Sequence, residues 1–371
     1  MMRSYFRVPM RSAYTHEEHN YKIIQYGLNN SYPQEVLYAW SRSSIAGACT
    51  KAYKDFIQGN GFEDSIYNKM IVNKDGDSIQ KLLFKLSNDY SKFKGFAIRF
   101  DVNLLGEYVC AEWLPFWQVR LGMPNELGQI DHVKTWDNWA GESTRYNVSA
   151  NDIKSLSLFN PDPSVIQKQI EDCGGIENYN GQVLYYVGES DFYPSCSFDN
   201  AFDDVISTGE LSHFNKNFIK NKFSASSIIV NETVSSGDDE YLRNKREVGK
   251  MSGSDTAGSV VYLEGNIRSF NPSLPDLSKQ HQVVSESLKD NIVECYNIPP
   301  VLVSRTRQGG FPNQDEITNS FDYYNGMTQH ERDMFSDVFE SFNQNWHFPL
   351  NTSGDFNIKP KTFNNGRNIN I

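Results

Sequence analysis

Two arginines occupy an unusual place in this sequence, between two stretches with helical periodicity. Arg305 and Arg307 precede the glycine pair Gly309-Gly310 in the segment VLVSRTRQGGFPNQ. Guanidinium groups form charge-assisted hydrogen bonds with phosphate oxygens, and paired glycines permit backbone conformations with positive φ. These arginines could therefore make brief contacts with phosphate groups, from a loop that the glycines allow to move. From the residues alone an ordinary interhelical loop with two exposed arginines is the commoner case, so both interpretations stay open.

Paired carboxylates are the second group of residues that could take part in a reaction, because two of them can hold the metal ions of a nuclease. Adjacent residues on a helix point in different directions, however, and helix starts favour acids in any case. No G-x-x-x-x-G-K phosphate loop is present. We therefore expect no catalysis and no cofactor, with a metal-dependent nuclease as the enzymatic alternative. The acid pairs are Asp203-Asp204, Asp238-Asp239 and Asp315-Glu316.

Composition and charge narrow the class of protein. The chain has 371 residues, of which 39% are hydrophobic and 13% aromatic, so it is long and apolar enough for a substantial core. Five widely spaced cysteines, an odd number, indicate neither a disulfide framework nor a zinc site. No apolar run is long enough to span a bilayer, and no leader peptide is evident, so we expect a cytoplasmic origin and no membrane partner.

The elements that must position these residues follow from hydrophobic periodicity. A helical pattern runs from Pro33 to Ile57 and stops before Gly59, and a second covers Asp77 to Phe93. From Lys94 to Phe159 the period is two, which predicts an antiparallel sheet, and residues 181–188 resemble another strand. The first half of the chain is thus predicted to be helical and then β-rich.

The second half of the chain is predicted to be mainly helical. A helix covers residues 198–219, and a small α/β module follows. Within this module SSIIVNE is predicted to be a strand, residues 238–251 a short charged helix, and SVVYLEGNIRSF a strand pair or one bent strand. A second helix follows, and the proline pair 299–300 is predicted to end it. A third helix is predicted from Asp315 to Trp346, followed by one strand. The fold class is therefore α+β, with a small subdomain carried on two helices. The residues predicted to face inward on the second helix are Val284, Leu288, Ile292, Cys295 and Tyr296.

The ordered set of motifs resembles the portal proteins of tailed bacteriophages. The set begins with YGLNNSYP and FIQGNGF, continues with FYP, SASSIIVNE and VVYLEG, and ends with IVECYNIPPVLVS before a glycine-rich loop and an acidic helix. It covers nearly the whole chain. The resemblance implies a ring, usually of twelve subunits, at one capsid vertex, through which DNA is packaged and later ejected.

The resemblance also implies a division of the chain. A β-rich wing covers residues 1–196, and two stem helices cover 197–225 and 272–300. Between the stem helices lies a small α/β clip at 226–271. A tunnel loop spans 301–313, and 314–371 form a long wing helix and a C-terminal wing strand. Because the sequence after Trp346 is short and rich in asparagine, we expect the helical crown of many portals to be absent or vestigial.

Three sets of site residues follow from the resemblance. The DNA-facing tunnel loop comprises Arg305, Arg307, Gln308, Gly309, Gly310 and Phe311. The clip residues expected to dock the terminase are Asp238, Asp239, Arg243 and Arg246. The candidates for an acidic channel wall are Asp315, Glu316 and Asp322.

The charge of the chain fits this interpretation. Net charge is -11, and residues 313–340 contain seven acids and one base, Arg332. A conduit must not bind the DNA that it conducts, so an acidic wall permits sliding. A solvated helix face is the commoner explanation of such a charge run.

The implied partners are double-stranded DNA bound without sequence preference, the terminase large subunit, the major capsid or scaffold protein, and a head-tail adaptor. The implied location is the capsid portal vertex of the virion, with the host cytoplasm during assembly. The alternative is another ring-forming virion or assembly protein, an adaptor or baseplate component, that binds only proteins. Ring assembly would also bury apolar helix surface on neighbouring subunits. Some of the large aromatic residues are expected in such contacts, although core packing is the default for any single one of them. The residues considered are Phe214, Phe218, Phe335, Phe339 and Trp346.

Overall fold

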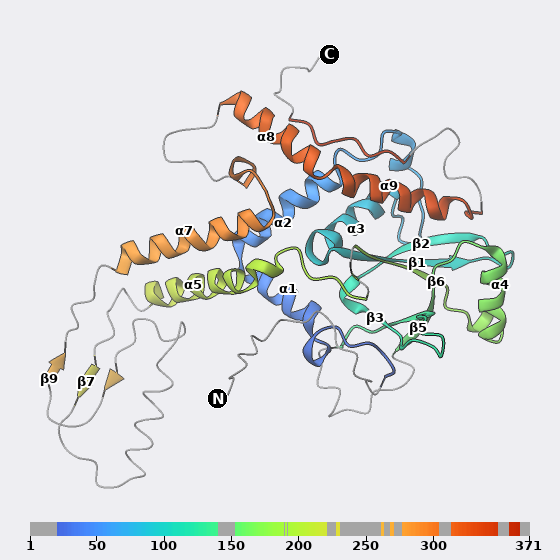
Figure 1. The fold of residues 1–371 in the computed structure, drawn as a ribbon, viewed down its shortest axis with the longest axis horizontal. Helices are drawn as coiled ribbons and strands as arrows, with labels where there is room; N and C mark the ends of the chain where they lie inside the picture. The colour runs from blue at the N-terminus through green and yellow to red at the C-terminus, as the bar shows by residue number, and fades with distance from the viewer. Residues whose placement is uncertain are drawn as a thin grey trace, which may run out of the picture. The chain divides into compact units, whose positions relative to one another are not determined.

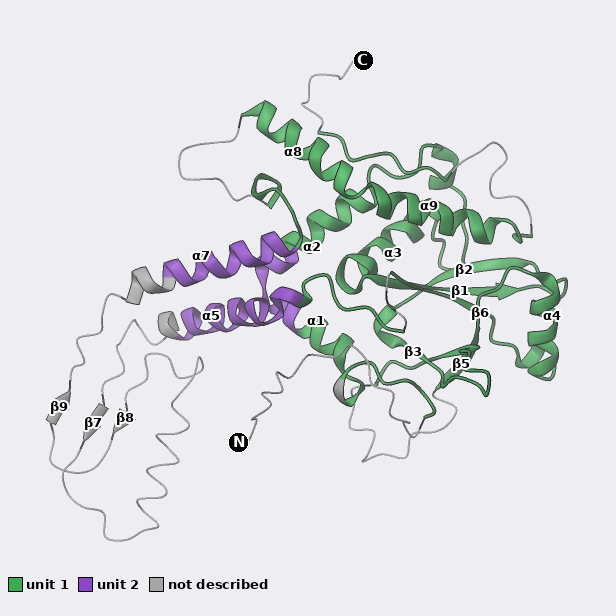
Figure 2. Ribbon diagram, viewed as in Figure 1, with its two compact units in different colours: residues 1–38, 48–199, 296–371 green, residues 39–47, 200–295 purple. Residues whose placement is uncertain are grey.

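The protein is described here by a computed structural model that combines helices and sheets in two compact units (Figures 1 and 2). Unit 1 comprises residues 1–38, 48–199 and 296–371, and unit 2 comprises 39–47 and 200–295. The mixed α+β class predicted from the sequence is confirmed. The residues that the structure describes are 21–139, 153–188, 190, 192–220, 228–230, 261–262, 268–270, 277–303, 313–347 and 356–363.

A six-stranded sheet forms the centre of unit 1, in the order β2-β1-β6-β5-β4-β3. Every neighbouring pair is antiparallel except β5 and β6, which are parallel. The antiparallel region predicted from the two-residue period is therefore confirmed, and residues 181–188 supply its sixth strand. The strands are β1 (Gly95–Val102), β2 (Tyr108–Leu114), β3 (Val119–Leu121), β4 (His132–Thr135), β5 (Lys154–Leu158) and β6 (Gln182–Val187).

The parallel pair is explained by a helix that the sequence analysis did not predict. Helix α4 (Pro163–Asp172) connects β5 to β6 and allows the chain to return in the same direction. Asp162 begins it by accepting a hydrogen bond from the Ser164 amide, and Pro163 takes the first helical position, where no amide donor is needed. A capping residue followed by proline was thus the sequence signal for this helix.

Three tight turns of unit 1 share one hydrogen-bond pattern. In the β1–β2 turn the Asn103 side-chain oxygen accepts hydrogen bonds from the amides of Leu105 and Glu107, both at 2.9 Å, and Gly106 has a φ of +80°. The same pattern occurs at the asparagines 73 and 125, each followed three residues later by a glycine with positive φ. The sequence Asn-x-x-Gly therefore fixes where these segments reverse.

One face of the sheet packs against helices α3 (Ile79–Phe93) and α9 (Gln329–Asn343) (Figure 1). Alternate residues of β1 enter this core, and Phe96 stacks on Phe335 with ring centroids 4.9 Å apart. Phe335 and Phe339 are fully buried, and Trp346 is 7% exposed. For these three aromatic residues the default of core packing is confirmed, because the core of their own unit covers them.

The remaining expected aromatics lie on helix α5. Phe214 is half-buried, and the side chain of Phe218 lies outside the described residues.

The N-terminal helical pattern is divided into two helices rather than one. Helix α1 (Tyr32–Arg42) ends where Ser43 begins helix α2 (Ser44–Ile57). The Ser43 hydroxyl accepts a hydrogen bond from the Ala46 amide, at 3.3 Å, and one from the Thr208 hydroxyl at 2.7 Å. A serine that caps a new helix interrupts the old one, although the apolar period continues across it.

Unit 2 contains the ends of α1 and α2 that meet at Ser43, helices α5 (Phe202–Lys220) and α7 (Leu277–Cys295), and a small sheet (Figure 2). Helices α5 and α7 lie side by side, and the Asn291 amide donates to the Asp204 carboxylate at 3.1 Å. Both helices were predicted. Of the residues predicted to face inward, Ile292 is buried, whereas Val284 is 52% exposed, because the packed part of α7 is its C-terminal half.

The small sheet has the order β8-β7-β9. Strand β7 (Ile228–Val230) pairs with β8 (Val261–Tyr262) in parallel and with β9 (Arg268–Phe270) antiparallel. The strand predicted in SSIIVNE is confirmed, and VVYLEGNIRSF forms two strands. The charged helix predicted at 238–251 lies outside the described residues.

A fully buried arginine, Arg120, organises the N-terminal side of unit 1. Its Nε donates to the Asn30 side-chain oxygen at 2.5 Å, and its two Nη atoms donate to the carbonyls of Asn30, Trp117 and Val119 and to the Gln34 side chain. All five guanidinium donors thus have acceptors. Burial lowers the pKa of Arg120 to about 10, so the group is still charged at neutral pH.

The two tyrosine-containing motifs of the sequence meet around this arginine. Tyr26, from YGLNNSYP, stacks on Tyr193, from FYP, with ring centroids 4.2 Å apart, and donates its hydroxyl to the Pro194 carbonyl. Tyr32 of the first motif donates to the Asp199 carboxylate at 2.7 Å. The first motif also places Asn30 at a φ of +58°, which aims its side chain and its carbonyl at the guanidinium. The contacts of these motifs therefore serve to stabilise the fold of unit 1.

The C-terminal segment 356–363 runs along residues 59–63. Gly61 accepts a hydrogen bond from the Lys359 amide at 2.8 Å, and Asn60 donates to the Lys359 carbonyl at 2.9 Å. The predicted C-terminal strand is represented among the described residues by a single bridge between Phe62 and Ile358. Gly59, which ends α2 with a φ of +54°, leaves no room for a β-carbon against the Lys359 carbonyl. Its role as a helix terminator is confirmed.

We expect Gly59→Ala to lower the free energy of unfolding by roughly 3 kcal/mol, from left-handed strain plus displacement of the Lys359 carbonyl. Gly76→Ala is the matched control, because Gly76 has a φ of +74° but a β-carbon added there would meet no other atom within 4 Å. The control should lose only about 1 kcal/mol. Urea unfolding followed by tryptophan fluorescence measures both, and equal losses would show that the Lys359 contact is unimportant.

Candidate functional site

The structure describes one of the three predicted sets of site residues. The acidic candidates Asp315, Glu316 and Asp322 lie on helix α8 (Gln314–Met327) and are exposed. The tunnel-loop residues Arg305, Arg307, Gln308, Gly309, Gly310 and Phe311 lie outside the described residues, as do the clip residues Asp238, Asp239, Arg243 and Arg246. The described part of the candidate site is therefore the two ends of the expected loop and the helix that follows it.

The chain enters the expected loop through a short fixed segment. Helix α7 ends at Cys295, before the prolines 299–300, and Asn297 adopts a φ of +51°. The prediction that the proline pair ends this helix is therefore wrong by several residues, because the turn at Asn297 reverses the chain first. The prolines instead begin a 3-10 helix, η7 (Pro300–Val303), whose last residue is buried.

Tyr296 anchors this segment to unit 1. Its hydroxyl shares a hydrogen bond of 2.8 Å with the Thr50 hydroxyl, and its carbonyl accepts one from the Tyr324 hydroxyl at 3.2 Å. Tyr324 lies on α8 and is 1% exposed. A hydrogen bond thus joins the segment that leads into the expected loop to the helix that follows the loop.

The chain leaves the expected loop at Asn313, the N-cap of α8. The Asn313 side chain accepts a hydrogen bond from the Glu316 amide at 2.7 Å. Asp315 and Glu316 occupy the first turn, where the helix dipole stabilises negative charge. Helix capping alone therefore explains why acids stand at these two positions. Asp322 is seven residues, about two turns, beyond Asp315 and so lies near the same face of the helix.

A shallow surface depression of about 440 Å³ adjoins this helix start. Asp315 and Glu316 line one side of it, together with Pro299 and the exposed ring of Tyr323. Asp322 is not part of its lining. The structure therefore brings two of the three acids to one open surface beside the ends of the expected loop.

The long helix predicted from Asp315 to Trp346 is broken in the middle. Helix α8 stops at Met327 and α9 starts at Gln329, with Thr328 at a φ of -102° and a ψ of 12°. Arg332 stabilises the break: its Nη2 donates to the Asn325 carbonyl at 2.6 Å, and its Nη1 donates to the Phe56 carbonyl and the Thr328 hydroxyl. The carbonyl of Asn325 is thus paired although the helical ladder is interrupted.

The burial of Arg332 changes the charge of the surface. The side chain is 5% exposed, and burial lowers its pKa. The single base of residues 313–340 is therefore inside the protein, and the exposed faces of α8 and α9 carry acids. On α9 these are Asp333, Asp337 and Glu340, while Glu331 is partly buried and accepts a hydrogen bond from the Tyr53 hydroxyl at 2.7 Å.

Two other classes of site are missing from the described residues. Within them, no group of three or more histidine, cysteine, aspartate or glutamate side chains is arranged to hold a metal ion. Among the helices that are described, none combines the length and the apolarity needed to cross a bilayer.

Comparison with known proteins finds a similar fold among solved structures but no match by sequence. No protein-family model matches the chain, and no curated protein matches it either. Among solved structures, a chain in the virion of a native gene transfer agent (GTA) particle aligns with a TM-score of 0.51 and 12% identity, over 84% of this chain and 81% of that chain. A chain in the neck of the native GTA particle, computed with C12 symmetry, gives the same TM-score and identity over 89% and 84%.

The chain shares its fold with these particle proteins. An HK97-family phage portal protein from Corynebacterium diphtheriae also aligns, at a TM-score of 0.45 and 8% identity over 79% of this chain and 85% of that chain. The resemblance drawn from the sequence motifs is confirmed at the level of the fold by the two particle structures. The motifs that carried it include the pair that meets at Arg120.

We expect Arg332→Met to lower the free energy of unfolding by about 2–4 kcal/mol, because the Phe56 and Asn325 carbonyls would stay buried without their charged donor. Arg42→Met is the control, since Arg42 forms a partly exposed ion pair with Glu210 at 3.0 Å. The control should cost less than about 1 kcal/mol. A similar loss in both variants, measured by urea unfolding, would mean that Arg332 does not stabilise the helix break.

Proposed function

We propose that this chain is a portal protein, one subunit of a ring at a capsid vertex through which the genome enters and leaves. The observation that carries the proposal is the fold shared with chains of the GTA virion and its neck. One of these structures was computed with C12 symmetry, in keeping with a ring of twelve subunits here. The ordered sequence motifs support the same reading.

In this proposal helix α8 contributes to the wall of the channel. Its exposed acids, Asp315, Glu316 and Asp322, are not neutralised by a base in the described part of the helix, because Arg332 is buried on α9. Duplex DNA carries about one negative charge per 1.7 Å of helix axis, so a negative wall disfavours lasting contact. Twelve copies of three acids would form a repulsive collar that allows the polymer to slide.

The expected tunnel loop adds the opposite charge at one level of this channel. Arg305 and Arg307 would make brief contacts with phosphates, while Gly309 and Gly310 allow the loop to move with the passing strand. Val303 and Asn313 bound this segment, and the first is buried while the second caps α8. A loop with two fixed ends is suited to small, repeated movements.

Docking and the absence of catalysis complete the proposal. The clip, with Asp238, Asp239, Arg243 and Arg246, would meet the terminase large subunit and later a head-tail adaptor, and the wing would contact the major capsid or scaffold protein. The chain itself would carry out no reaction, because the motor that hydrolyses nucleotide is the terminase. The expected location is the virion vertex, with assembly in the host cytoplasm.

The charge of α8 supplies a test. We expect the triple variant D315N/E316Q/D322N to form rings that retain duplex DNA at least about tenfold more tightly than the original protein at 0.15 M salt, because the repulsive collar is removed. The measurement is fluorescence anisotropy of labelled duplex DNA with assembled rings.

The matched control removes the same number of charges from α9, as D333N/D337N/E340Q, which are also exposed acids. We expect it to change DNA retention less than threefold or so. Equal tightening by both variants would indicate a general charge effect and remove the proposed role of α8. No DNA association by any variant would favour a ring that binds only proteins, such as an adaptor.

A further inference from the structure

A buried carboxylate joins helix α3 to the end of strand β2. Asp89 of α3 is 3% exposed, and its Oδ2 accepts a hydrogen bond from the Trp113 indole at 2.8 Å and another from the Phe116 amide at 3.0 Å. Trp113 belongs to β2, and Phe116 begins a short 3-10 helix, η3 (Phe116–Gln118). One oxygen of Asp89 therefore holds both ends of the segment 113–116, in which the chain leaves the sheet.

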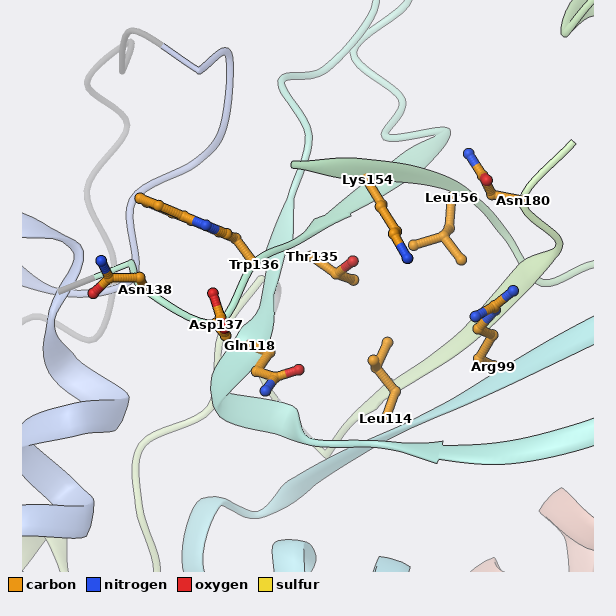
Figure 3. A pocket seen from close by; sticks show the side chains of 10 residues that line it. All are labelled: Arg99, Leu114, Gln118, Thr135, Trp136, Asp137, Asn138, Lys154, Leu156 and Asn180. Atoms are coloured by element: carbon orange, nitrogen blue, oxygen red, sulfur yellow. The ribbon is translucent and has the colours of Figure 1, made fainter. Parts of the chain in front are cut away.

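The segment that Asp89 holds contributes to the wall of a pocket. Leu114 lies within the segment and Gln118 follows it, and both line a pocket of about 930 Å³ on the sheet (Figure 3). Trp113 and Phe116 are fixed by Asp89 on either side of Leu114. A change in the charge of this carboxylate therefore acts on the backbone that forms this part of the wall.

The hydrogen-bond donors that reach Asp89 are neutral, which leaves its negative charge poorly compensated. An ionised carboxylate inside a protein is strongly unfavourable unless an opposite charge pairs with it, and such a group tends to take up a proton instead. Burial raises the pKa of Asp89 to about 6, although the two hydrogen bonds and the charge of Lys92 act in the opposite direction. Burial also lowers the pKa of Lys92, which is 8% exposed.

Charged groups approach Asp89 mainly from the helices. Lys92, one turn further along α3, acts on it directly, and Lys54 of α2 acts in turn on Lys92. Lys85, also on α3, stands 5.7 Å from the centroid of the indole ring that binds Asp89. On β2 the neighbouring residue Glu112 lies on the opposite face of the sheet, and η3 has no ionisable side chain. The strand side of Asp89 thus offers hydrogen bonds but no opposite charge.

We propose that Asp89 is a proton-binding site of the folded protein, and that uptake of one proton stabilises the junction between α3 and the segment 113–116. The neutral carboxyl needs no opposite charge, and it still presents an oxygen that can accept from the indole and the amide. An aspartate in the unfolded chain binds its proton only near about pH 4. Because the folded protein binds this proton more tightly, its contribution to stability rises as the pH falls from about 7 toward 4.

This site is independent of the proposed function, since it uses none of the residues of α8, of the expected tunnel loop or of the expected clip. The sign of its effect is also distinctive. Carboxylates that are paired in the folded state lose stability on acidification, whereas Asp89 should gain it in the range from about pH 7 to about pH 4.5.

The first test follows the indole N–H resonances of the full-length protein, labelled with isotopic tryptophan, from about pH 8 to about pH 5. The Trp113 resonance, assigned with Trp113→Phe, should shift with a midpoint near pH 6, because the charge on its acceptor disappears. Trp139 is the matched control in the same spectrum, since its indole donates at 2.7 Å to the Gln118 carbonyl, which does not titrate. Its resonance should stay constant over this range.

The second test removes the titrating group with Asp89→Asn, which is neutral at every pH. Between about pH 7.5 and pH 4.5 the unfolding equilibrium constant of the original protein should fall about 20-fold relative to that of this variant. Asp172→Asn, at an exposed aspartate of α4, is the control and should change this ratio less than about twofold. Urea unfolding at the two pH values measures all three proteins.

The two tests decide the proposal separately, because the first is read in the original protein and does not require that Asp89→Asn folds. The proposal is overturned if the Trp113 resonance titrates only near about pH 4, as for an ordinary carboxyl group. It is also overturned if Trp113 and Trp139 shift together, if the Trp113 shift persists in Asp89→Asn, or if the two aspartate variants respond to pH alike.

Discussion

The buried guanidinium of Arg120 is the interaction on which unit 1 depends most. A charged group inside a protein is strongly unfavourable unless its donors are satisfied, and here all five donate to oxygens of Asn30, Gln34, Trp117 and Val119. These acceptors are backbone carbonyls and side-chain amides, so the chain must hold them in place. The left-handed turn at Asn30 places the two Asn30 oxygens, just before α1 begins. The motifs YGLNNSYP and FYP meet beside this arginine, through the stacked rings of Tyr26 and Tyr193. Tyr32 of the first motif donates a hydrogen bond to Asp199.

A second buried arginine, near the C-terminal end of the sequence, also donates hydrogen bonds to carbonyls of distant segments. Arg332 binds carbonyls of Phe56 and Asn325 and so joins α2 to the break between α8 and α9. The C-terminal segment adds to the same region, since the Asn325 side chain exchanges hydrogen bonds with Lys361. The break between α8 and α9 is thus stabilised by a charge buried on α9. Because the same charge is buried, it does not offset the exposed acids of the two helices.

The sequence predicts the parts of the fold that depend on local periodicity. It does not predict helix breaks and packing partners that depend on residues distant in the chain. The alternating strands of 95–135 and the stripe of α3 were predictable, because apolar residues recur with the period of their element. The breaks at Ser43 and Thr328 were not, since the apolar period continues across both. The second is stabilised by the buried Arg332 of α9, which also binds the Phe56 carbonyl of the distant helix α2. Core packing was the default for Phe335 and Phe339, but their aromatic partners were not predictable, because they come from segments distant in the sequence, such as Phe96 of β1 and Phe356. Of the candidate site, the acids of α8 were predictable as a charge run. The depression beside them also includes Pro299, from before the expected loop, and no motif marks it.

The central claim is that copies of this chain form a closed ring with a passage for DNA. Cryo-electron microscopy of the purified protein, viewed end-on, tests it most directly. The account predicts a closed ring, of twelve subunits, with a central opening of at least about 20 Å, wide enough for a duplex whose two backbones enclose the grooves. It also predicts that α8 and its acids face that opening. A closed oligomer without a channel, or a ring in which α8 lies on the outer surface, would contradict it.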